Sequence, residues 1–409
     1  MAKKTQPVRS GPTDYLQPRL YDVTFTFDPA AVPEEVSSVG LVGEFLFYRS
    51  QLKGATDEVM LTGGPKFPPS GYEPGMSSIG GRYFQRMARD EKTGLFTLTL
   101  RLPAGAYPYG FLVNPRLTKP AEGRAAFTNV ICEDGKPKGT GGAQMLVDPK
   151  NPPLAPTPDG AQRQSVRYVG SVEECLWVPA ADPAVKGTLT YMSYRDIRGD
   201  QRSLGVYLPA GYDKTQKYPL ILVSHGGGGN ECDWFHQGSL AHLMDNLVSS
   251  HKTEPAVVVT MNNTVYGWDF AEIDQNLVQC ILPLLERVFS LDTRRERTAF
   301  CGLSMGGITT MYTYMHLPER IGYFGAFSGG FAGGAGFTLD APILRETKLL
   351  IGCGEEDMAY NPRPIGVPPT MQALKDAGLE YTPYFVPGSH DWFVWPAMFA
   401  HWAREFLWK

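Results

Sequence analysis

The sequence lacks several features that would indicate a particular partner or site. No apolar run approaches the length of a membrane-spanning helix, so we expect no membrane span. The formal net charge is only −4, which gives no electrostatic reason to expect nucleic acid or an anionic membrane as a partner. The six cysteines form no CxxC pair and no zinc-ligand spacing. Free thiols, mostly buried, are therefore expected, and no metal site is predicted.

Histidine and tryptophan are absent from the first 170 residues. All seven residues of each type come later, beginning with Trp177 and His225. Histidine-based catalysis therefore cannot be built from the first half alone. With 409 residues, the chain is also too long for one ordinary core, and two units with separate roles are expected. The opening segment MAKKTQPVRSGPTDY is polar, so no signal peptide is expected in the sequence as given.

The first half is predicted to be all-β. The segment 21–29, YDVTFTFDP, alternates with a period of two. In 95–103, LFTLTLRLP, the set from Phe96 to Leu102 at every second position would face a core. Short strands broken by Gly and Pro favour a small β-sandwich. The Pro-rich stretch 148–162 predicts an extended linker, so we divide the chain into domains 1–160 and 161–409.

The second half alternates predicted strands and helices. The apolar runs 218–225 and 254–262 are typical of buried parallel strands. Segment 271–289 has helical periodicity. On its expected apolar face lie Leu277, Ile281, Leu284, Leu285 and Val288. Further strands are expected at 297–302, 323–330, 347–354 and 380–388, with a helix after 304 and a closing helix in 395–408. This order predicts a doubly wound α/β sheet with right-handed crossovers.

A serine between glycines follows one of these strands. The segment RTAFCGLSMGGITT, residues 297–310, contains Gly302-Leu303-Ser304-Met305-Gly306, which matches G-x-S-x-G between a strand and a helix. A serine on such a strained turn needs glycine on both sides because the chain packs closely there. The helix N-terminus also favours developing negative charge on the reacting oxygen. This context favours a nucleophile over a simple Gly-rich turn.

A nucleophilic serine needs a base and an acid that follow it in the chain. His390, in VPGSHDWFVW, is the only histidine downstream of Ser304 that follows a predicted strand. The acid is expected after the strand TKLLIG, where the loop offers Glu355, Glu356 and Asp357. We choose Asp357, with Glu356 as the alternative, because Asp357 lies furthest into the loop. The other histidines, including His236 and His242, are expected in helical stretches, on helix surfaces or in loops, except that His225 ends a strand upstream of the serine.

Two backbone N–H groups should bind the oxyanion of the tetrahedral intermediate. One is expected from Met305, directly after the serine. The other is expected from the glycine loop 226–229, with Gly227 preferred and Gly226 as its close alternative. A phosphate-binding role for this loop is disfavoured because no Lys-Ser or Lys-Thr pair follows the glycines.

Three tryptophans fall in loops at the same predicted end of the sheet. Trp234, Trp268 and Trp392 could form an aromatic rim that binds a flat acyl group or a sugar ring. The alternative is that each packs into the core at the base of its loop.

Residues 190–409 resemble carbohydrate esterase family 1, the esterase D type, and within it the feruloyl esterases. The resemblance rests on VYLPAGYDKTQKYPLILVSHGGGGNECDW, LMDNL, GWDFAE, CGLSMGGITT, GAFSGG and GSHDWFVW. It implies an α/β-hydrolase fold with Ser304, Asp357 and His390 as nucleophile, acid and base. It further implies hydrolysis of ferulate or acetate esters on plant polysaccharide such as arabinoxylan. No cofactor and a secreted or periplasmic location are implied as well.

The first half resembles the immunoglobulin-like domain of carbohydrate-binding module family 48. The segments VGLVGEFLFYRS and GLFTLTLRLPAGAYPYGFLVN carry the resemblance. Members of that family often place a tryptophan after GDFN, whereas the corresponding segment here, GEFLFYRS, has none.

Other functions fit parts of the pattern. An acetyl xylan esterase or a thioester hydrolase would need a smaller acyl pocket. A basic pocket would favour a siderophore trilactone esterase, because the siderophore is anionic. A glycan-binding protein without activity is the non-enzymatic alternative. The presence of the serine, the histidine and the acid at the expected positions argues against this alternative.

Overall fold

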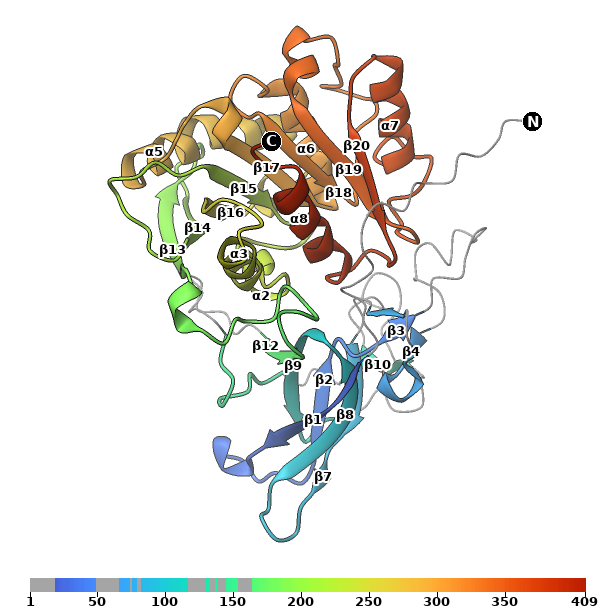
Figure 1. Cartoon of the computed structure of the whole chain (residues 1–409). Helices are drawn as coiled ribbons and strands as arrows, with labels where there is room; N and C mark the ends of the chain where they lie inside the picture. The colour runs from blue at the N-terminus through green and yellow to red at the C-terminus, as the bar shows by residue number, and fades with distance from the viewer. Residues whose placement is uncertain are drawn as a thin grey trace, which may run out of the picture. The chain divides into compact units, whose positions relative to one another are not determined.

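A computed structural model describes residues 19–48, 66–73, 76–78, 82–116, 130–131, 137–138, 145–153 and 164–409. These residues belong to two compact units (Figure 1). The C-terminal unit contains Ala180–His390 and Val394–Lys409. The N-terminal unit contains the described residues up to Pro179, together with Asp391–Phe393.

The division between the units falls later than the 160/161 boundary that the sequence predicts. Strand β12 (Ser165–Val169) pairs with β9 (Gly105–Val113) and so belongs with the first unit. The division lies between Pro179 and Ala180. Most of the predicted linker, residues 154–162, lies outside the described residues.

The described residues of the N-terminal unit form β-strands and short 3₁₀ turns. Three sheets have the strand orders β1-β8-β7, β11-β10-β6-β2-β9-β12 and β4-β3-β5. Besides β9 and β12, the strands are β1 (Leu20–Phe27), β2 (Val39–Gly43), β3 (Phe47–Tyr48), β4 (Lys66–Phe67), β5 (Ser77–Ser78), β6 (Arg82–Arg86), β7 (Ala88–Arg89), β8 (Phe96–Pro103), β10 (Val130–Ile131) and β11 (Pro137–Lys138).

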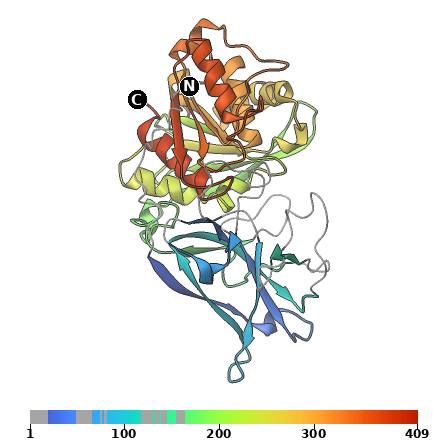
Figure 2. The same cartoon turned by 90° about the vertical axis from the view of Figure 1, so that its right-hand side faces the viewer.

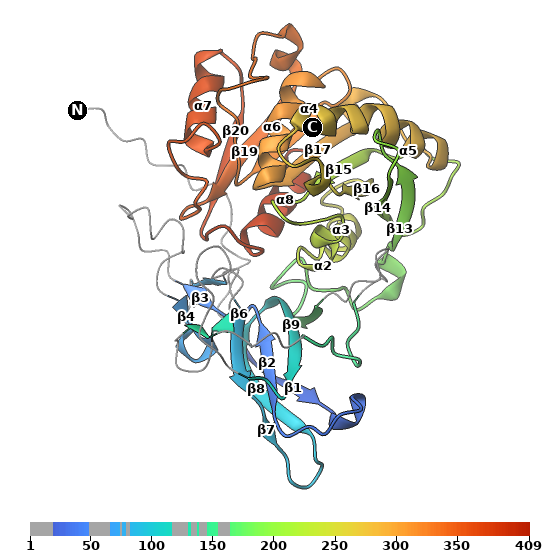
Figure 3. The same ribbon diagram turned by 180° about the vertical axis from the view of Figure 1, so that it is seen from behind.

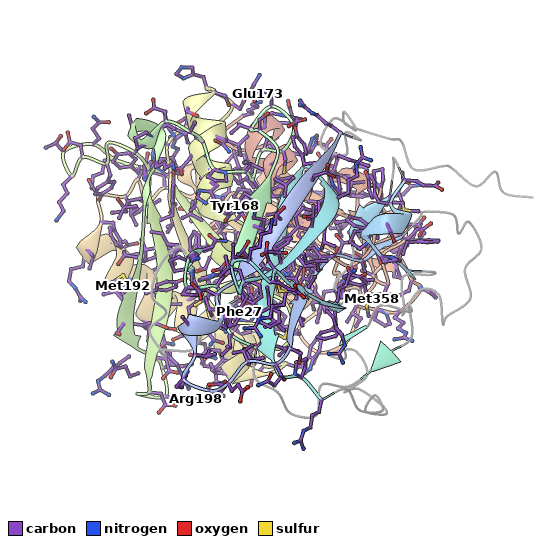
Figure 4. The ribbon with its side chains drawn as sticks, turned by 90° about the horizontal axis from the view of Figure 1, so that it is seen from below. Phe27, Tyr168, Glu173, Met192, Arg198 and Met358 are labelled. Carbon is purple, nitrogen blue, oxygen red and sulfur yellow. The ribbon has the colours of Figure 1, made fainter. Side chains whose placement is uncertain are left out.

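Aromatic side chains join the two larger sheets of this unit. The ring centroid of Phe25 in β1 lies 4.9 Å from that of Tyr109 in β9. The ring centroid of Phe27, labelled in Figure 4, lies 5.1 Å from that of Phe111. In β8, Phe96, Leu100 and Leu102 are buried, as the alternation predicts, and Leu98 is half-buried. The first half is thus all-β in its described part.

An eight-stranded mixed sheet forms the centre of the C-terminal unit. Its order is β13-β14-β16-β15-β17-β18-β19-β20, in which β14 runs antiparallel to both of its neighbours, β13 and β16, and all other neighbouring strands run parallel. The strands are β13 (Thr188–Arg195), β14 (Gln201–Leu208), β15 (Leu220–Ser224), β16 (Val257–Met261), β17 (Thr298–Leu303), β18 (Tyr323–Phe327), β19 (Lys348–Gly354) and β20 (Thr382–Val386). The six strands from β15 to β20 confirm the predicted series, whereas β13 and β14 were not predicted.

Helices cover both faces of this sheet. They are α2 (Asp233–His236), α3 (Leu240–Ser249), α4 (Phe270–Asn276), α5 (Leu282–Val288), α6 (Met305–His316), α7 (Val367–Asp376) and α8 (Val394–Glu405). Helices α3 and α8 lie in front of the sheet in Figure 1, whereas α4 and α6 lie in front in Figure 3. Figure 2 shows the sheet from its β20 edge. This arrangement is that of an α/β-hydrolase, so the predicted doubly wound sheet is confirmed for its parallel part.

Two details of the helices differ from the prediction. The helix expected over 271–289 is divided by a π-helical turn at Leu277–Ile281, just before Pro283, whose ring nitrogen cannot donate a hydrogen bond. The wider turn shifts the register, and Val288 is 40% exposed. His236 and His242, expected on helix surfaces or in loops, are buried.

Among the described residues, none of the helices combines the length and the apolar character that a bilayer span requires.

Candidate active site

Ser304 occupies the sharp turn between β17 and α6. Its φ of 54° and ψ of −115° lie outside the conformations that residues other than glycine usually adopt. The backbone N–H of Ser304 donates to the carbonyl of Phe327 in the neighbouring strand, at 2.9 Å, which holds this turn against the sheet. Met305 is the first residue of α6. Its N–H is therefore one of the donors at the helix N-terminus that have no acceptor within the helix.

The two glycines of the motif leave no room for a side chain. A Cβ on Gly302 would lie 2.5 Å from the carbonyl oxygen of Gly306. A Cβ on Gly306 would lie 2.5 Å from the carbonyl oxygen of Ser224, at the end of β15. The steric reason inferred from the sequence for these glycines is therefore confirmed.

His390 connects Ser304 to Asp357. Its Nε2 lies 2.9 Å from the Oγ of Ser304, and its Nδ1 lies 2.8 Å from the Oδ1 of Asp357. The carboxylate can only accept, so Nδ1 carries the hydrogen and Nε2 is left to accept the serine hydroxyl. Asp357 is 1% exposed and also accepts from the N–H of Ala359. The structure thus brings the three predicted residues together, and the carboxylate that reaches His390 is that of Asp357 rather than the alternative Glu356.

The glycine loop lies against the Ser304 turn. A Cβ on Gly226 would be 3.4 Å from the Cβ of Ser304, and one on Gly227 would be 4.0 Å from the Cβ of Met305. Gly227 is exposed. Both glycines considered for the oxyanion site are therefore next to the serine and the first turn of α6.

His225 fixes the orientation of the peptide between these glycines. Its Nε2 accepts from the backbone N–H of Asn263 at 2.9 Å, so the hydrogen is on Nδ1, which donates to the carbonyl of Gly226 at 2.6 Å. The N–H of Gly229 donates to the same carbonyl. Burial lowers the pKa of His225, which keeps the ring neutral. Because the peptide is planar and trans, pinning this C=O also sets the direction of the Gly227 N–H on its other side.

Trp234 is not part of an accessible rim, which corrects the expectation for this residue. Its side chain is 1% exposed, and its indole N–H donates to the carbonyl of Ser224 at 3.0 Å. The ring packs against Phe327 and Phe399. Trp234 therefore belongs to the core under the glycine loop and cannot contact a substrate there.

Trp268 remains a candidate for substrate contacts. Trp268 is 63% exposed, and its ring meets Phe270 edge to face at 5.9 Å. The 3₁₀ turn just before Trp268 is tied to the glycine loop, because the hydroxyl of Thr264 donates to the carbonyl of Gly229 at 2.8 Å. Trp392 is half-buried and is grouped with the N-terminal unit, so its role beside Ser304 stays a prediction.

Two residues next to the acid were missed. Ser328 directly follows β18, and its hydroxyl donates to Asp357 at 2.6 Å. The indole N–H of Trp395, in α8, donates to Ser328 at 2.8 Å. The position of Ser328 at the C-terminal end of a parallel strand was a usable signal, since functional side chains gather at that edge. Nothing in the sequence distinguishes Trp395 from the other tryptophans.

Comparisons with known proteins show which families the chain is similar to. Residues 197–337 match the Esterase family, described as "Putative esterase". The "Endo-1,4-beta-xylanase/feruloyl esterase" of Xylanibacter ruminicola is 29% identical over 260 residues, covering 56% of this chain and 34% of that protein. The "Endo-1,4-beta-xylanase Y" of Acetivibrio thermocellus is 27% identical over 278 residues, covering 61% of this chain and 25% of that protein. The chain thus spans only about a third or less of the length of these relatives.

A solved structure extends the likeness to both halves. The enterobactin esterase of Shigella flexneri has a TM-score of 0.52 at 18% identity, and the match covers 94% of this chain and 93% of that one. At this level of identity the likeness shows a shared fold. The match over residues 197–337 and the similarity to the Xylanibacter protein support a carboxylic ester hydrolase in the second half of the chain.

Proposed function

We propose that the protein is a serine esterase that releases ferulate or a related hydroxycinnamate from plant cell-wall polysaccharide such as arabinoxylan. The observation that carries this proposal is the continuous hydrogen-bonded series from Ser304 through His390 to Asp357, placed on the strained turn before α6. The named activity of the Xylanibacter relative adds support for the acyl group.

In the proposed reaction, the Oγ of Ser304 attacks the ester carbonyl while its proton passes to Nε2 of His390. The oxyanion of the tetrahedral intermediate accepts hydrogen bonds from the N–H groups of Met305 and Gly227. The carbon–oxygen bond to the alcohol then breaks, and His390 gives its proton to the departing alcohol. Water attacks the acyl-enzyme by the same route, which releases the carboxylic acid and returns the proton to Ser304. Asp357 holds His390 in the tautomer with its hydrogen on Nδ1 and stabilises the imidazolium that forms when His390 takes the second proton.

The charge of the loops favours a neutral ester. The loops 225–233, 262–269, 328–337, 355–361 and 387–393 contain no lysine or arginine. They contain seven acidic residues, including Asp357. An anionic siderophore lactone would meet no positive side chain from these loops, whereas an uncharged methoxyphenol ring could lie against the exposed Trp268.

For the N-terminal unit we propose the immunoglobulin-like fold of carbohydrate-binding module family 48. Its paired all-β sheets support this proposal. Trp177, the first tryptophan of the chain, is 2% exposed and therefore cannot stack on a sugar ring.

The test compares hydrolysis of methyl ferulate and p-nitrophenyl acetate by the wild type and by Ser304→Ala. We expect turnover of methyl ferulate that is lost in the variant. Turnover of the acetate alone would support a deacetylase and contradict the hydroxycinnamate assignment.

A third substrate separates the remaining alternative. Serine-dependent hydrolysis of a catecholate trilactone, without hydrolysis of methyl ferulate, would indicate a siderophore esterase. If none of the three substrates is turned over, the enzymatic proposal is wrong, and binding of arabinoxylan by the intact protein becomes the property to measure.

A further inference from the structure

Ser328 lies between the acid of the proposed site and an indole. Its Oγ is 2.6 Å from Oδ2 of Asp357 and 2.8 Å from Nε1 of Trp395. Ser328 is 2% exposed and Trp395 is 6% exposed, so both contacts are inside the protein. The mechanism proposed above uses neither residue.

The direction of these hydrogen bonds follows from the groups themselves. An indole N–H can only donate, and an ionised carboxylate can only accept. The hydroxyl of Ser328 must therefore accept from Trp395 and give its single hydrogen to Asp357. This engages Oδ2, while Oδ1 accepts from His390 and from the N–H of Ala359. With both oxygens held, the carboxylate cannot rotate away from the imidazole without breaking a bond.

Trp395 also contacts the other side of the same pair. Its ring meets the ring of His390 edge to face, with centroids 5.0 Å apart and an angle of 88° between the planes. A single side chain of α8 thus touches the base directly and reaches the acid through Ser328.

The backbone of Ser328 gives a second indication. Its φ is 53°, a left-handed conformation that glycine adopts more easily than serine. Its N–H donates to the carbonyl of Gly352 at 2.8 Å. A glycine would fit this backbone with less strain, so the contribution of a serine at this position lies in its hydroxyl.

We infer that Ser328 and Trp395 are positioning residues, which hold Asp357 and His390 in the arrangement that activates Ser304. This inference rests on the proposed function. The two residues act as one series, because Trp395 reaches the carboxylate only through the serine hydroxyl.

The test uses Ser328→Gly, Trp395→Phe and the double variant, assayed on p-nitrophenyl acetate. Glycine suits the φ of residue 328, and phenylalanine keeps a ring beside His390, so folding should survive in both. We expect kcat to fall about ten- to a hundredfold in Ser328→Gly, the usual effect of losing one hydrogen bond to a charged group, with KM unchanged. Trp395→Phe loses a bond to the neutral serine hydroxyl, so its kcat should fall less, by about three- to tenfold. The kcat of the double variant should be little lower than that of Ser328→Gly alone, because both changes break the same series of hydrogen bonds.

Matched controls come from similar residues elsewhere in the unit. Ser239 is a buried serine with a φ of 50°, so Ser239→Gly makes the same change away from the acid. Trp402 is a buried tryptophan of α8 whose indole N–H donates to the carbonyl of Phe324. Trp402→Phe is therefore the matched control for Trp395→Phe. We expect kcat of both controls to stay within about threefold of wild type, well below the effect expected for a charged partner.

A second readout does not depend on turnover. The proton on Nδ1 of His390, shared with Asp357, should give a downfield resonance in the proton NMR spectrum of the wild type. We expect it to shift or broaden in Ser328→Gly and Trp395→Phe and to remain in the controls. An unchanged resonance, or kcat values equal to those of the controls, would overturn the inference. Failure of the proposed function would instead appear as a wild type that is inactive on every ester.

Discussion

His390 holds Ser304 and Asp357 on opposite nitrogens of one imidazole ring. The distance from Nε2 to the serine Oγ is 2.9 Å, and that from Nδ1 to the aspartate Oδ1 is 2.8 Å. In the proposed mechanism, Asp357 is buried and accepts the hydrogen bond from Nδ1, so it determines which nitrogen can take the serine proton. We therefore expect the carboxylate to control the reactivity of a hydroxyl with which it has no direct contact.

Replacing this carboxylate by an amide tests that relationship. In Asp357→Asn, the side-chain NH₂ can donate to Nδ1, which favours the tautomer with hydrogen on Nε2 and removes the acceptor for Ser304. We expect kcat to fall by roughly 10⁴ with little change in the fold. Glu356→Gln, one residue earlier, is the matched control and should keep kcat near that of wild type. Equal losses in the two variants, measured on p-nitrophenyl acetate, would count against Asp357 as the acid.

Gly227 offers a test of the oxyanion donor. Gly227→Pro removes the N–H, and we expect kcat to fall by roughly 10²- to 10³-fold, as when a single oxyanion donor is lost. Gly227→Ala keeps the N–H, and its Cβ would lie 4.0 Å from the Cβ of Met305, an ordinary contact distance. The alanine variant should therefore remain active. If proline is tolerated as well as alanine, the donor lies elsewhere, and Gly226 is the next candidate.

The residues of the site differ in how far the sequence could predict them. Ser304, His390 and Asp357 follow three strands that are recognisable as apolar runs, and a parallel sheet brings the ends of such strands to one edge. Ser328 follows a fourth strand, but its hydroxyl matters only because Trp395, far away in the chain, reaches it. That contact depends on how α8 packs, which no local pattern encodes.

The tryptophans also show that local sequence does not predict which side chains are buried. The sequence places Trp234 and Trp268 in similar loops, yet one is buried and the other is 63% exposed. Burial of Trp234 depends on Phe327 and Phe399, which come from distant elements. In the fold, the edge strand β13 and its neighbour β14 escaped prediction because only the strands that are buried on both faces form continuous apolar runs.

These two tryptophans should respond differently to substitution. Trp268→Ala should raise KM for methyl ferulate several-fold to about tenfold and leave p-nitrophenyl acetate unaffected, because only the aromatic acyl group can use the ring. Trp234→Ala should lower the free energy of unfolding by about 3–5 kcal/mol, as for a large core aromatic. Steady-state kinetics and urea denaturation measure the two effects. A loss of stability without a change in KM for Trp268→Ala would remove that residue from the substrate site.

Asp274 gives the enzyme a predictable dependence of stability on pH. This carboxyl is buried between α4 and α6, where the hydroxyl of Thr313 donates to Oδ1 at 2.7 Å, and within the described residues Oδ2 has no hydrogen-bond partner. Burial raises its pKa from 3.8 to about 7, although the bond from Thr313 opposes the shift. Between these two values the folded state keeps a proton that the unfolded state has lost. The free energy of unfolding should therefore fall as the pH rises from about 4 to about 7 and change little from this group above that range.

Asp274→Asn removes this titration while keeping an oxygen that can accept from Thr313. The shift corresponds to at most about 4 kcal/mol across the window, so the variant should gain stability relative to wild type as the pH rises. Urea denaturation at several pH values between 4.5 and 8 measures the difference, with the exposed Asp376→Asn as the control. If the curves of wild type and Asp274→Asn run parallel, the carboxyl is already ionised in the folded protein. In that case a group that has not been identified must neutralise it, because an unpaired carboxylate buried between two helices would be too costly to keep.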